Sequence, residues 1–453
     1  MMKDRSMNRN IHRRSRGILV ALLAMGTLSA CGVLGGSSDP TTPTVGNREP
    51  ILSRIAATVQ ADPELADVAV VLPAARENAA WPQAGGNASK SIGHLSFTEA
   101  PQRAWTATIP GSNNRRRLAA SPVVADGMLF AVGTDGAVYA FDAATGARRW
   151  THRIEVERDL QNVVFGGGAT WFNGRIYATG GAGDVVALDA ASGAELWRVK
   201  MSGPLRGSPT VAFNALYVMT QDNQIHALNM NDGALIWQDA AAGGQAGVFG
   251  VAAPAAGQGT VIAGYSSGEL VAYRYENGRN LWSDALARTS ISTQVGTLTD
   301  VDADPIIDAG RVYALGQGGR MAAYELVTGQ RIWELNLAGI STPAVAGEWI
   351  FTLTDDARLL AIARSTGRVR WITQLTQWRN ERSRENPIFW QGPVLADNRL
   401  WIASSRGEVL SVDVESGATM PFAQLNDGVS LAPVLADRTL YILDDGGRIT
   451  AWR

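Results

Sequence analysis

The stretch GAVYAFDAATGARRW, residues 136–150, decides the fold because it recurs along the chain. Further copies are GDVVALDAASGAELW at 183–197, NQIHALNMNDGALIW at 223–237, GELVAYRYENGRNLW at 268–282, GRMAAYELVTGQRIW at 319–333 and ARLLAIARSTGRVRW at 357–371. Two weaker copies follow, GEVLSVDVESGATMP at 407–421 and GRITAWR at 447–453. An acid, a threonine and glycines around one turn could form a chemical site, but repetition at this spacing is typical of a structural unit.

The first half of each copy has the pattern of a β-strand. Apolar residues alternate with others at a period of two, which predicts a strand. One column in the middle of this pattern is small in every copy, and a small residue there lets a neighbouring sheet approach closely. Its members are Ala140, Ala187, Ala227, Ala272, Ala323, Ala361, Ser411 and Ala451.

The second half of each copy reads as a tight turn followed by another strand. In the first copy Asp142 can accept hydrogen bonds from the backbone ahead of it, and Gly146 can adopt the positive φ that closes a hairpin. Trp150 then supplies an indole large enough to fill the wedge between two sheets. The glycine recurs at 193, 233, 278, 329, 367 and 417, and the tryptophan at 197, 237, 282, 333 and 371, with Pro421 breaking the series. We interpret the stretch as a hairpin with a packing tryptophan.

Two shorter strands are expected upstream of each hairpin. They are indicated by SPVV at 121–124, SPTV at 208–211, TPAV at 342–345, GPVL at 392–395 and APVL at 432–435, with weaker equivalents near Gly168, Ala253 and Asp304. Eight units of four strands, about 45 residues apart, predict an all-β, eight-bladed β-propeller. The stretch RAWTATI around Trp105 is a lone fourth strand, and we expect it to pair with GRITAWR to close the ring.

The N-terminus has the pattern of an export signal. A basic region, with Lys3 and five arginines against Asp4, precedes the apolar run at 18–28, which is too short for a mature transmembrane helix. Leu28, Ser29, Ala30 and Cys31 resemble the lipobox of bacterial lipoproteins. We therefore expect a signal peptide at 1–30, a lipidated Cys31 with a flexible tether at 31–80, and the propeller at 81–453. Gly32 after the cysteine resembles the outer-membrane sorting pattern, which places the chain at the periplasmic face of the outer membrane.

Composition gives little support to catalysis or to nucleic-acid binding. The chain has a formal charge of −2, and removing the basic N-terminal region leaves about −7, which disfavours a nucleic-acid partner. Cys31 is the single cysteine, so no internal disulfide can form. No HExxH, CxxC or GxSxG motif occurs, and His226 occupies a strand column. We expect no catalytic residue, no metal and no cofactor.

The pattern of Ala140, Asp142, Thr145, Gly146 and Trp150 resembles the tryptophan-docking repeat of quinoprotein (PQQ) dehydrogenases. Those enzymes are also eight-bladed propellers. Many carry a vicinal disulfide beside the quinone, which this chain cannot form, and they need a calcium site. Because the repeat is shared, a quinone-dependent oxidoreductase is nevertheless one alternative function.

The same repeat on a lipidated chain of this length resembles the BamB family, the propeller lipoproteins of the outer-membrane β-barrel assembly (BAM) machinery. The segment TLTDVDADPII, 297–307, is similar to the element through which that family contacts BamA. The resemblance implies that Asp300 and Asp302 face a POTRA domain of BamA, and that Val248 and Phe249 stand in for a Leu-Arg pair. It also implies a scaffold that binds other BAM subunits and incoming outer-membrane proteins.

Other interpretations of these segments stay open. Asp300 and Asp302 could be solvated loop acids, and the protein could be a general adhesion module of the cell envelope. The connection TQWRNERSRENPIFW, 376–390, is also long, and its charges could serve a partner, a peptide or a lipid headgroup.

Overall fold

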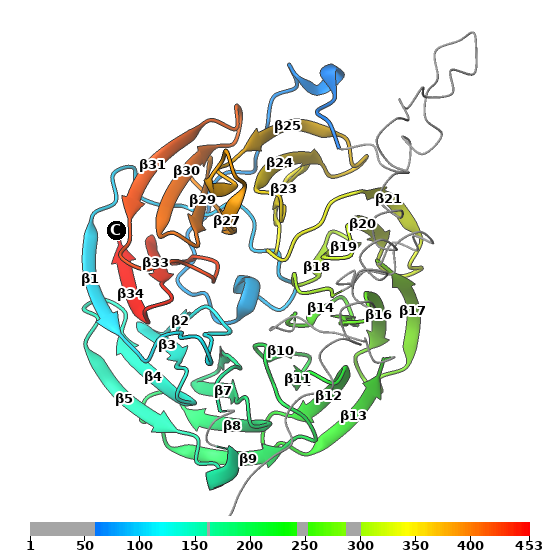
Figure 1. The fold of residues 1–453 in the computed structure, drawn as a ribbon. Helices are drawn as coiled ribbons and strands as arrows, with labels where there is room; N and C mark the ends of the chain where they lie inside the picture. Colours follow the sequence, from blue (N-terminus) through cyan, green and yellow to red (C-terminus); the bar gives the residue numbers. More distant parts are fainter. Residues whose placement is uncertain (1–58, 161–163, 242–251, 287–299) are drawn as a thin grey trace, which may run out of the picture. The chain divides into compact units, whose positions relative to one another are not determined.

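The computed structural model describes residues 59–160, 164–241, 252–286 and 300–453. They belong to one compact unit, Thr58–Arg453, in which eight four-stranded sheets stand around a common centre (Figure 1). The predicted all-β, eight-bladed propeller is therefore confirmed. None of the helices among these residues is long and apolar enough to cross a membrane.

The first four blades each contain four strands in chain order from the centre outward. Blade 1 comprises β2 (Val123–Ala125), β3 (Met128–Val132), β4 (Ala137–Asp142) and β5 (Arg148–Arg153). Blade 2 comprises β6 (Ala169–Phe172), β7 (Arg175–Thr179), β8 (Asp184–Asp189) and β9 (Glu195–Lys200). Blade 3 comprises β10 (Thr210–Ala212), β11 (Ala215–Met219), β12 (Gln224–Asn229) and β13 (Leu235–Ala240). Blade 4 comprises β14 (Ala255–Gly257), β15 (Thr260–Gly264), β16 (Glu269–Arg274) and β17 (Asn280–Ala285).

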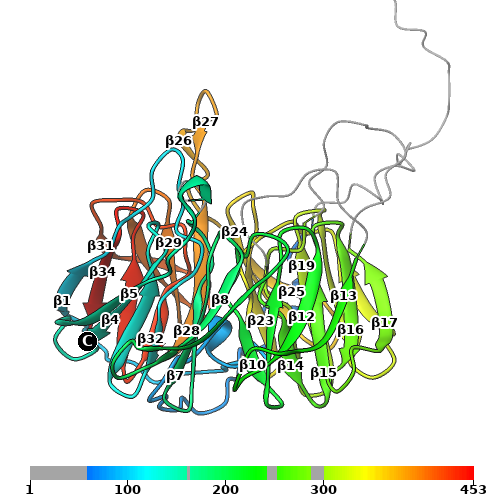
Figure 2. The same cartoon turned by 90° about the horizontal axis from the view of Figure 1, so that it is seen from below.

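The next three blades repeat this order, and one of their connections carries an additional hairpin. Blade 5 comprises β18 (Ile306–Asp308), β19 (Arg311–Gly316), β20 (Arg320–Glu325) and β21 (Arg331–Leu335). Blade 6 comprises β22 (Ala344–Ala346), β23 (Trp349–Leu353), β24 (Arg358–Ala363) and β25 (Val369–Gln374). Blade 7 comprises β28 (Trp390–Ala396), β29 (Arg399–Ser404), β30 (Glu408–Asp413) and β31 (Thr419–Gln424). The hairpin of β26 (Trp378–Asn380) and β27 (Glu385–Pro387) projects from the ring before blade 7 (Figure 2).

Blade 8 joins the two ends of the described chain. Its strands are β32 (Val434–Ala436), β33 (Thr439–Leu443), β34 (Arg448–Trp452) and, outermost, β1 (Arg103–Thr108). β1 pairs antiparallel with β34, with Trp105 opposite Ala451 and Thr106 opposite Thr450. The predicted closure by the segment around Trp105 is confirmed, and it removes two sheet edges that would otherwise be open.

The repeated glycine and tryptophan meet across blade boundaries. Gly146 has φ +73°, and a Cβ built there would lie 2.6 Å from the Trp105 ring of the preceding blade. The Trp105 Nε1–H donates to the Ala143 carbonyl at 3.0 Å. The same bond recurs from Trp150, Trp197, Trp237, Trp282, Trp333 and Trp371 to carbonyls of the following blade. The hairpin interpretation is thus confirmed, and the glycine has a second role as the surface that receives the indole.

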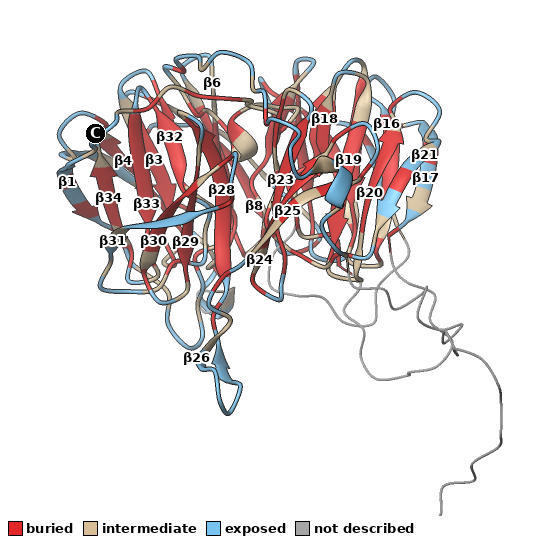
Figure 3. Cartoon of the chain, turned by 90° about the horizontal axis from the view of Figure 1, so that it is seen from above, coloured by how far each residue is buried: buried red, intermediate tan, exposed pale blue. Residues whose placement is uncertain are grey.

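Burial follows the radial position of each strand. The second and third strands of a blade are buried along nearly their whole length, as in β3 and β4, whereas the outer strand β5 is mostly exposed (Figure 3). The apolar core consists of clusters between neighbouring blades, and one of them joins Phe130 of blade 1 to Ile176 of blade 2. Such interlocking makes the ring a rigid support for its connecting segments.

One face of the ring carries the connections between blades. Because the four strands alternate in direction, every link from an outer strand to the next inner strand emerges on the same side, which we call the connection face. The β26–β27 hairpin stands on this face (Figure 2). The turns between first and second strands lie on the opposite face.

Residues 76–97 form a plug that closes the centre of the ring at the opposite face. Trp81 pairs with Val124 of blade 1, and the Ala88 carbonyl accepts the Ala256 N–H of blade 4. Leu95 pairs with Ala396 of blade 7. In Figure 1 this blue segment crosses the middle of the ring. The sequence analysis included residues 81–97 in the propeller without predicting an element there, and it assigned residues 59–80 to the tether, although these too contact the ring.

Candidate functional site

The expected partner-binding residues divide between the described and undescribed parts of the chain. Val248 and Phe249 lie outside the described residues, as does Cys31. Asp300 and Asp302 are described, and they lie in the connection from β17 to β18, between blades 4 and 5. The geometry of the candidate site is therefore built from the second pair and its surroundings.

The connections that carry the two pairs join adjacent blades, and their described ends lie on the connection face. Residues 241–254 link β13 to β14, and residues 286–305 link β17 to β18 of the following blade. Their C-terminal ends are joined, because the Ala253 N–H donates to the Asp304 Oδ1 at 2.7 Å. The Asp304 N–H in turn donates to the Thr342 Oγ1 of the next connection at 3.0 Å. A chain of hydrogen bonds thus fixes where these segments enter the inner strands.

Asp300 is held inside the connection. The residue is 1% exposed, and its carbonyl accepts the Gln317 N–H at 2.9 Å. The adjacent Val301 N–H donates to the Tyr265 carbonyl at 3.2 Å, and the Val301 side chain packs over Gly264. In this conformation Asp300 presents almost no surface to a partner. Its side chain is therefore neither an exposed contact nor an acid in solvent.

Asp302 is more accessible and lines the cavity at the centre of the ring. Burial, followed by the charges of Asp300 and Asp355, raises the pKa of Asp302 to about 7. Burial and then the neighbouring Asp356 raise the pKa of Asp355 to about 6. Among the described residues, neither Asp302 nor Asp355 forms an ion pair with lysine or arginine. These carboxyl groups therefore form an acidic site whose ionisation a basic partner would favour.

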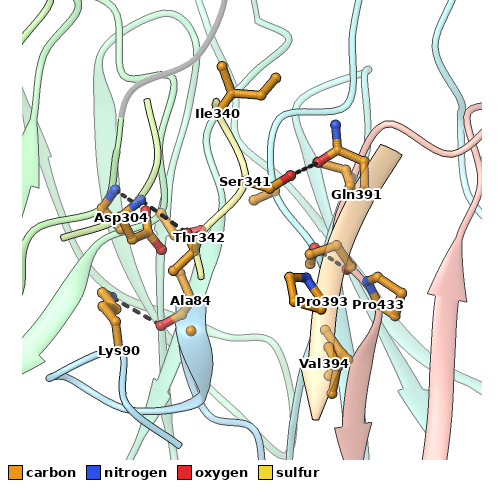
Figure 4. A pocket seen from close by; sticks show the side chains of 18 of the residues that line it. Ala84, Lys90, Asp304, Ile340, Ser341, Thr342, Gln391, Pro393, Val394 and Pro433 are labelled. Atoms are coloured by element: carbon orange, nitrogen blue, oxygen red, sulfur yellow. Dashed lines mark hydrogen bonds between the residues drawn. The ribbon is translucent and has the colours of Figure 1, made fainter. Parts of the chain in front are cut away.

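The central cavity has a volume of about 640 Å³ and is bounded by the inner strands and the plug. Figure 4 shows Lys90 of the plug beside Ala84 and Asp304 on one wall, with Ser341 and Gln391 on the other. Lys90 donates to the Ala84 carbonyl and to the Thr210 Oγ1, each at 3.0 Å. Lys90 is the one charged residue between Glu77 and Glu99, a signal in the sequence that could have revealed the plug.

Lys90 and Asp304 form an oppositely charged pair in the cavity wall. Lys90 is 3% exposed, and its burial lowers its pKa to about 8 despite the charge of Asp304. Burial also raises the pKa of Asp304, while Lys90 acts in the opposite direction. Each charge offsets part of the desolvation cost of the other, so the pair couples the plug to the connection between blades 4 and 5.

The described side chains do not assemble a donor set for a metal ion. Within residues 59–453, leaving aside the undescribed gaps, there is no group of three or more His, Cys, Asp or Glu that could hold a metal ion. His226 lies on β12 as predicted, and burial lowers its pKa. His94 has a structural position, contacting the Pro73 carbonyl through Nδ1 and the Asn398 N–H through Nε2.

Known proteins with this fold include enzymes as well as assembly factors. The BamB structure from Moraxella catarrhalis superposes with a TM-score of 0.67 at 19% identity, covering 78% of this chain and 100% of that one. The quinohemoprotein alcohol dehydrogenase from Comamonas testosteroni also has a TM-score of 0.67, at 14% identity, over 83% of this chain and 81% of that one. At these identities both similarities show the shared propeller fold and nothing more.

Sequence comparison matches the chain to assembly factors. The outer membrane protein assembly factor BamB of Vibrio cholerae is 30% identical over 351 residues, which cover 77% of this chain and 88% of that protein. BamB of Escherichia coli is 26% identical over 390 residues, covering 77% and 88%. The family model described as outer membrane protein assembly factor BamB matches residues 102–163 and 134–373. With most of the ring matched by that model, the chain belongs to the BamB family of outer membrane protein assembly factors.

Proposed function

We propose that this protein is a non-enzymatic scaffold of outer-membrane protein assembly. The observation that carries the proposal is the match of the BamB family model to the ring. The ring itself offers a rigid body with long connections gathered on one face, which suits a binding scaffold. Anchoring follows from the lipobox-like sequence before Cys31, which supports attachment to the periplasmic face of the outer membrane.

Within this proposal the POTRA domains of BamA bind the connection face at blades 3 to 5. Val248 and Phe249 provide an apolar contact, and Asp300 and Asp302 provide the acidic one. The two acids act differently, because Asp302 lines the cavity whereas Asp300 is buried. Asp302 forms the contact with a basic side chain of BamA, and the negative charge of Asp300 strengthens the attraction. Other BAM subunits and incoming outer-membrane proteins are further partners in the same proposal.

The test is a titration of the purified protein against the periplasmic domains of BamA. Asp302→Lys replaces attraction by repulsion and should weaken binding by at least about tenfold, with the largest effect at low salt. Glu348→Lys is the matched control, because Glu348 is an exposed acid in the turn between β22 and β23, on the opposite face. Equal affinity of wild type and Asp302→Lys would show that Asp302 is not in the interface. A lack of binding by wild type would rule out BamA as the partner.

A further inference from the structure

A segment that precedes the plug lies against the outer edge of blade 6. The Asp62 N–H donates to the Val369 carbonyl of β25 at 2.7 Å, just before the short 3-10 helix η2 (Pro63–Leu65). The Val59 carbonyl accepts a bond from the Arg358 Nη1 at 3.4 Å. Residues 59–72 thus cover an outer strand whose edge is otherwise open.

Two arginines of β25 and its turn hold this segment. Arg368 contacts the Asp62 carboxylate through Nε at 2.5 Å and the Glu64 carboxylate through Nη2 at 2.6 Å. The Arg370 Nε donates to the Val68 carbonyl at 2.5 Å. Arg370 also forms an ion pair with Glu415.

The Glu415 carboxylate extends this polar network to the next residues of the segment. Its Oε2 accepts the Val70 N–H at 2.7 Å, so one acid of blade 7 contacts both Arg370 and the covering segment. The Asp62 carboxyl is likewise held in its charged form, because its hydrogen bond from Arg368 lowers its pKa.

The apolar part of this contact consists of Val70 and two half-buried side chains, Val59 against the core of blades 5 and 6 and Leu72 against the core of blades 6 and 7. Val70 is 8% exposed and packs with the core cluster of blades 6 and 7 that contains Trp371. In contrast, Val68 is 42% exposed and Val71 is 73% exposed. Because ion pairs at a surface are weak and screened by salt, this contact should be much less stable than the ring beneath it.

The plug that follows is attached more firmly. The buried Asn78 donates to the Leu435 carbonyl of blade 8 at 2.6 Å, and its own carbonyl accepts the Asp437 N–H at 2.7 Å. Farther along, Trp81 is 7% exposed and Lys90 is 3% exposed. The path of the chain therefore has a weak attachment at blade 6 followed by a strong attachment at the centre.

We propose that residues 59–72 form a releasable latch that sets where the N-terminal part of the chain leaves the ring. With the latch closed, the chain leaves at Asp62 on the outer edge of blade 6. With the latch open, it leaves at Pro73, whose carbonyl contacts His94 of the plug, and the 11 residues from Asp62 to Leu72 join the tether. A fully extended chain of that length adds about 35–40 Å of reach.

The two states differ in orientation as well as in reach. A pull on the N-terminal segment acts on the rim of blade 6 when the latch is closed and on the plug when it is open. The open state also exposes Arg368, Arg370 and the contact surface of Val70. This inference concerns the ring and its own residues, so it holds whether or not BamA is the partner.

Amide hydrogen exchange of the full chain tests the latch. The reporters are the Asp62 and Val70 amides, whose acceptors are the Val369 carbonyl and the Glu415 carboxylate. In wild type at low salt we expect both amides to be protected, yet to exchange much faster than amides of β23. The variant R368A/R370A should speed exchange at both reporters by about tenfold, without changing exchange in β23.

Two further variants separate the latch from general destabilisation. R379A removes an exposed arginine of β26 and should leave both reporters unchanged. D62N/E64Q removes the charges from the other side of the contact and should reproduce the faster exchange at Asp62. Raising the salt concentration should accelerate exchange in wild type but not in R368A/R370A.

Three results would overturn the latch. The first is a lack of protection at Asp62 and Val70 in wild type. The second is unchanged protection in R368A/R370A, which would show that the arginines do not hold the segment. The third is exchange of the Asp62 and Val70 amides at the same rate as the amides of β23. The segment would then open only when the ring unfolds. A thermal melt of each variant confirms that the ring is folded.

Discussion

Trp105 and Gly146 lie 41 positions apart in the sequence and touch across the boundary between blades 8 and 1, with the indole packed where a side chain of residue 146 would begin. Six more tryptophans contact the following blade in this way. The series stops at Pro421 of blade 7, and blade 8 has no hairpin between its outer two strands because β34 and β1 come from different ends of the chain. Here Phe422 contacts Trp452 instead, with ring centroids 4.9 Å apart.

Gly146→Ala should destabilise the ring more than an alanine at an equally strained but open position. The new Cβ would meet the Trp105 ring at 2.6 Å, in addition to the cost of a positive φ. We expect a loss of about 2–4 kcal/mol in the free energy of unfolding. Gly127→Ala is the control, because Gly127 has φ +71° and a Cβ added there would meet nothing within 4 Å, so it should lose about 1–2 kcal/mol. Urea unfolding measures both, and equal losses would rule out the docking contact as the cause.

Lys90→Met should loosen the plug. The substitution leaves Asp304 buried without its nearest positive charge and removes the bonds to Ala84 and Thr210. We expect a loss of about 2–4 kcal/mol at pH 7. The loss should shrink at pH 5, because the pKa of Asp304 rises further in the variant and its proton then removes the unpaired charge.

Arg274→Met serves as the control for this prediction. Arg274 forms an ion pair with Glu276, and the two side chains are 51% and 46% exposed, so its loss should cost less than about 1 kcal/mol. Denaturant unfolding at the two pH values gives the comparison. A Lys90→Met loss as small as that of Arg274→Met would show that the buried pair does not hold the plug.

The acidic site predicts a stability that falls as the pH rises. Asp302 has a pKa of about 7 in the folded state against an ordinary value of 3.8, so its proton stabilises the folded state. That contribution is complete below about pH 4 and is lost as the pH rises through 7. Asp302→Asn should therefore gain about 1–3 kcal/mol over wild type at pH 8 and almost nothing at pH 4.

Glu348→Gln, at an exposed acid, should leave the pH profile unchanged. Thermal melts between pH 4 and pH 8 compare the three proteins. If Asp302→Asn and wild type have parallel profiles, Asp302 does not carry the raised pKa.

Cys31→Ala should yield a protein that still folds but no longer fractionates with membranes. The cysteine precedes the described ring by 28 positions, and a lipid chain there would supply membrane attachment without packing into a blade. Envelope fractionation followed by circular dichroism of the soluble fraction tests both parts. A variant that stays with the membrane would contradict the lipid anchor, and one without β signal would contradict independent folding.

The blades were predictable from the sequence because their determinants are local and repeated. Asp142, Gly146 and Trp150 recur with fixed spacing, so one hairpin explains seven, and the lone strand around Trp105 then requires a partner at the other end. The sequence did not predict which indole packs on which glycine. The pattern shows that each hairpin needs its glycine, but not which tryptophan of a neighbouring blade contacts it.

The plug and the acidic site escaped prediction for a different reason. Residues 76–97 contact several blades, among them blades 1, 4, 7 and 8, but they repeat no motif and therefore have no period to detect. The burial of Asp300 depends on Tyr265 and Gln317, which belong to two other turns, so no local pattern in the connection distinguishes it from the more accessible Asp302. The latch likewise rests on Arg368, about 300 positions from the Asp62 and Glu64 carboxylates that it binds, and on Arg370, equally far from the Val68 carbonyl.

The pairing of β1 with β34 also has a consequence for biosynthesis. A ribosome makes β1 long before β34, since residues 109–447 come between them. Until β34 arrives, β1 has no partner and the plug has no blade 8 to bind, so nascent chains expose open edges throughout synthesis. Loss of the few residues that form β34, through a late stop codon or proteolytic trimming, would leave the entire ring unsealed. The stability of β1 therefore depends on whether β34 has been made and retained.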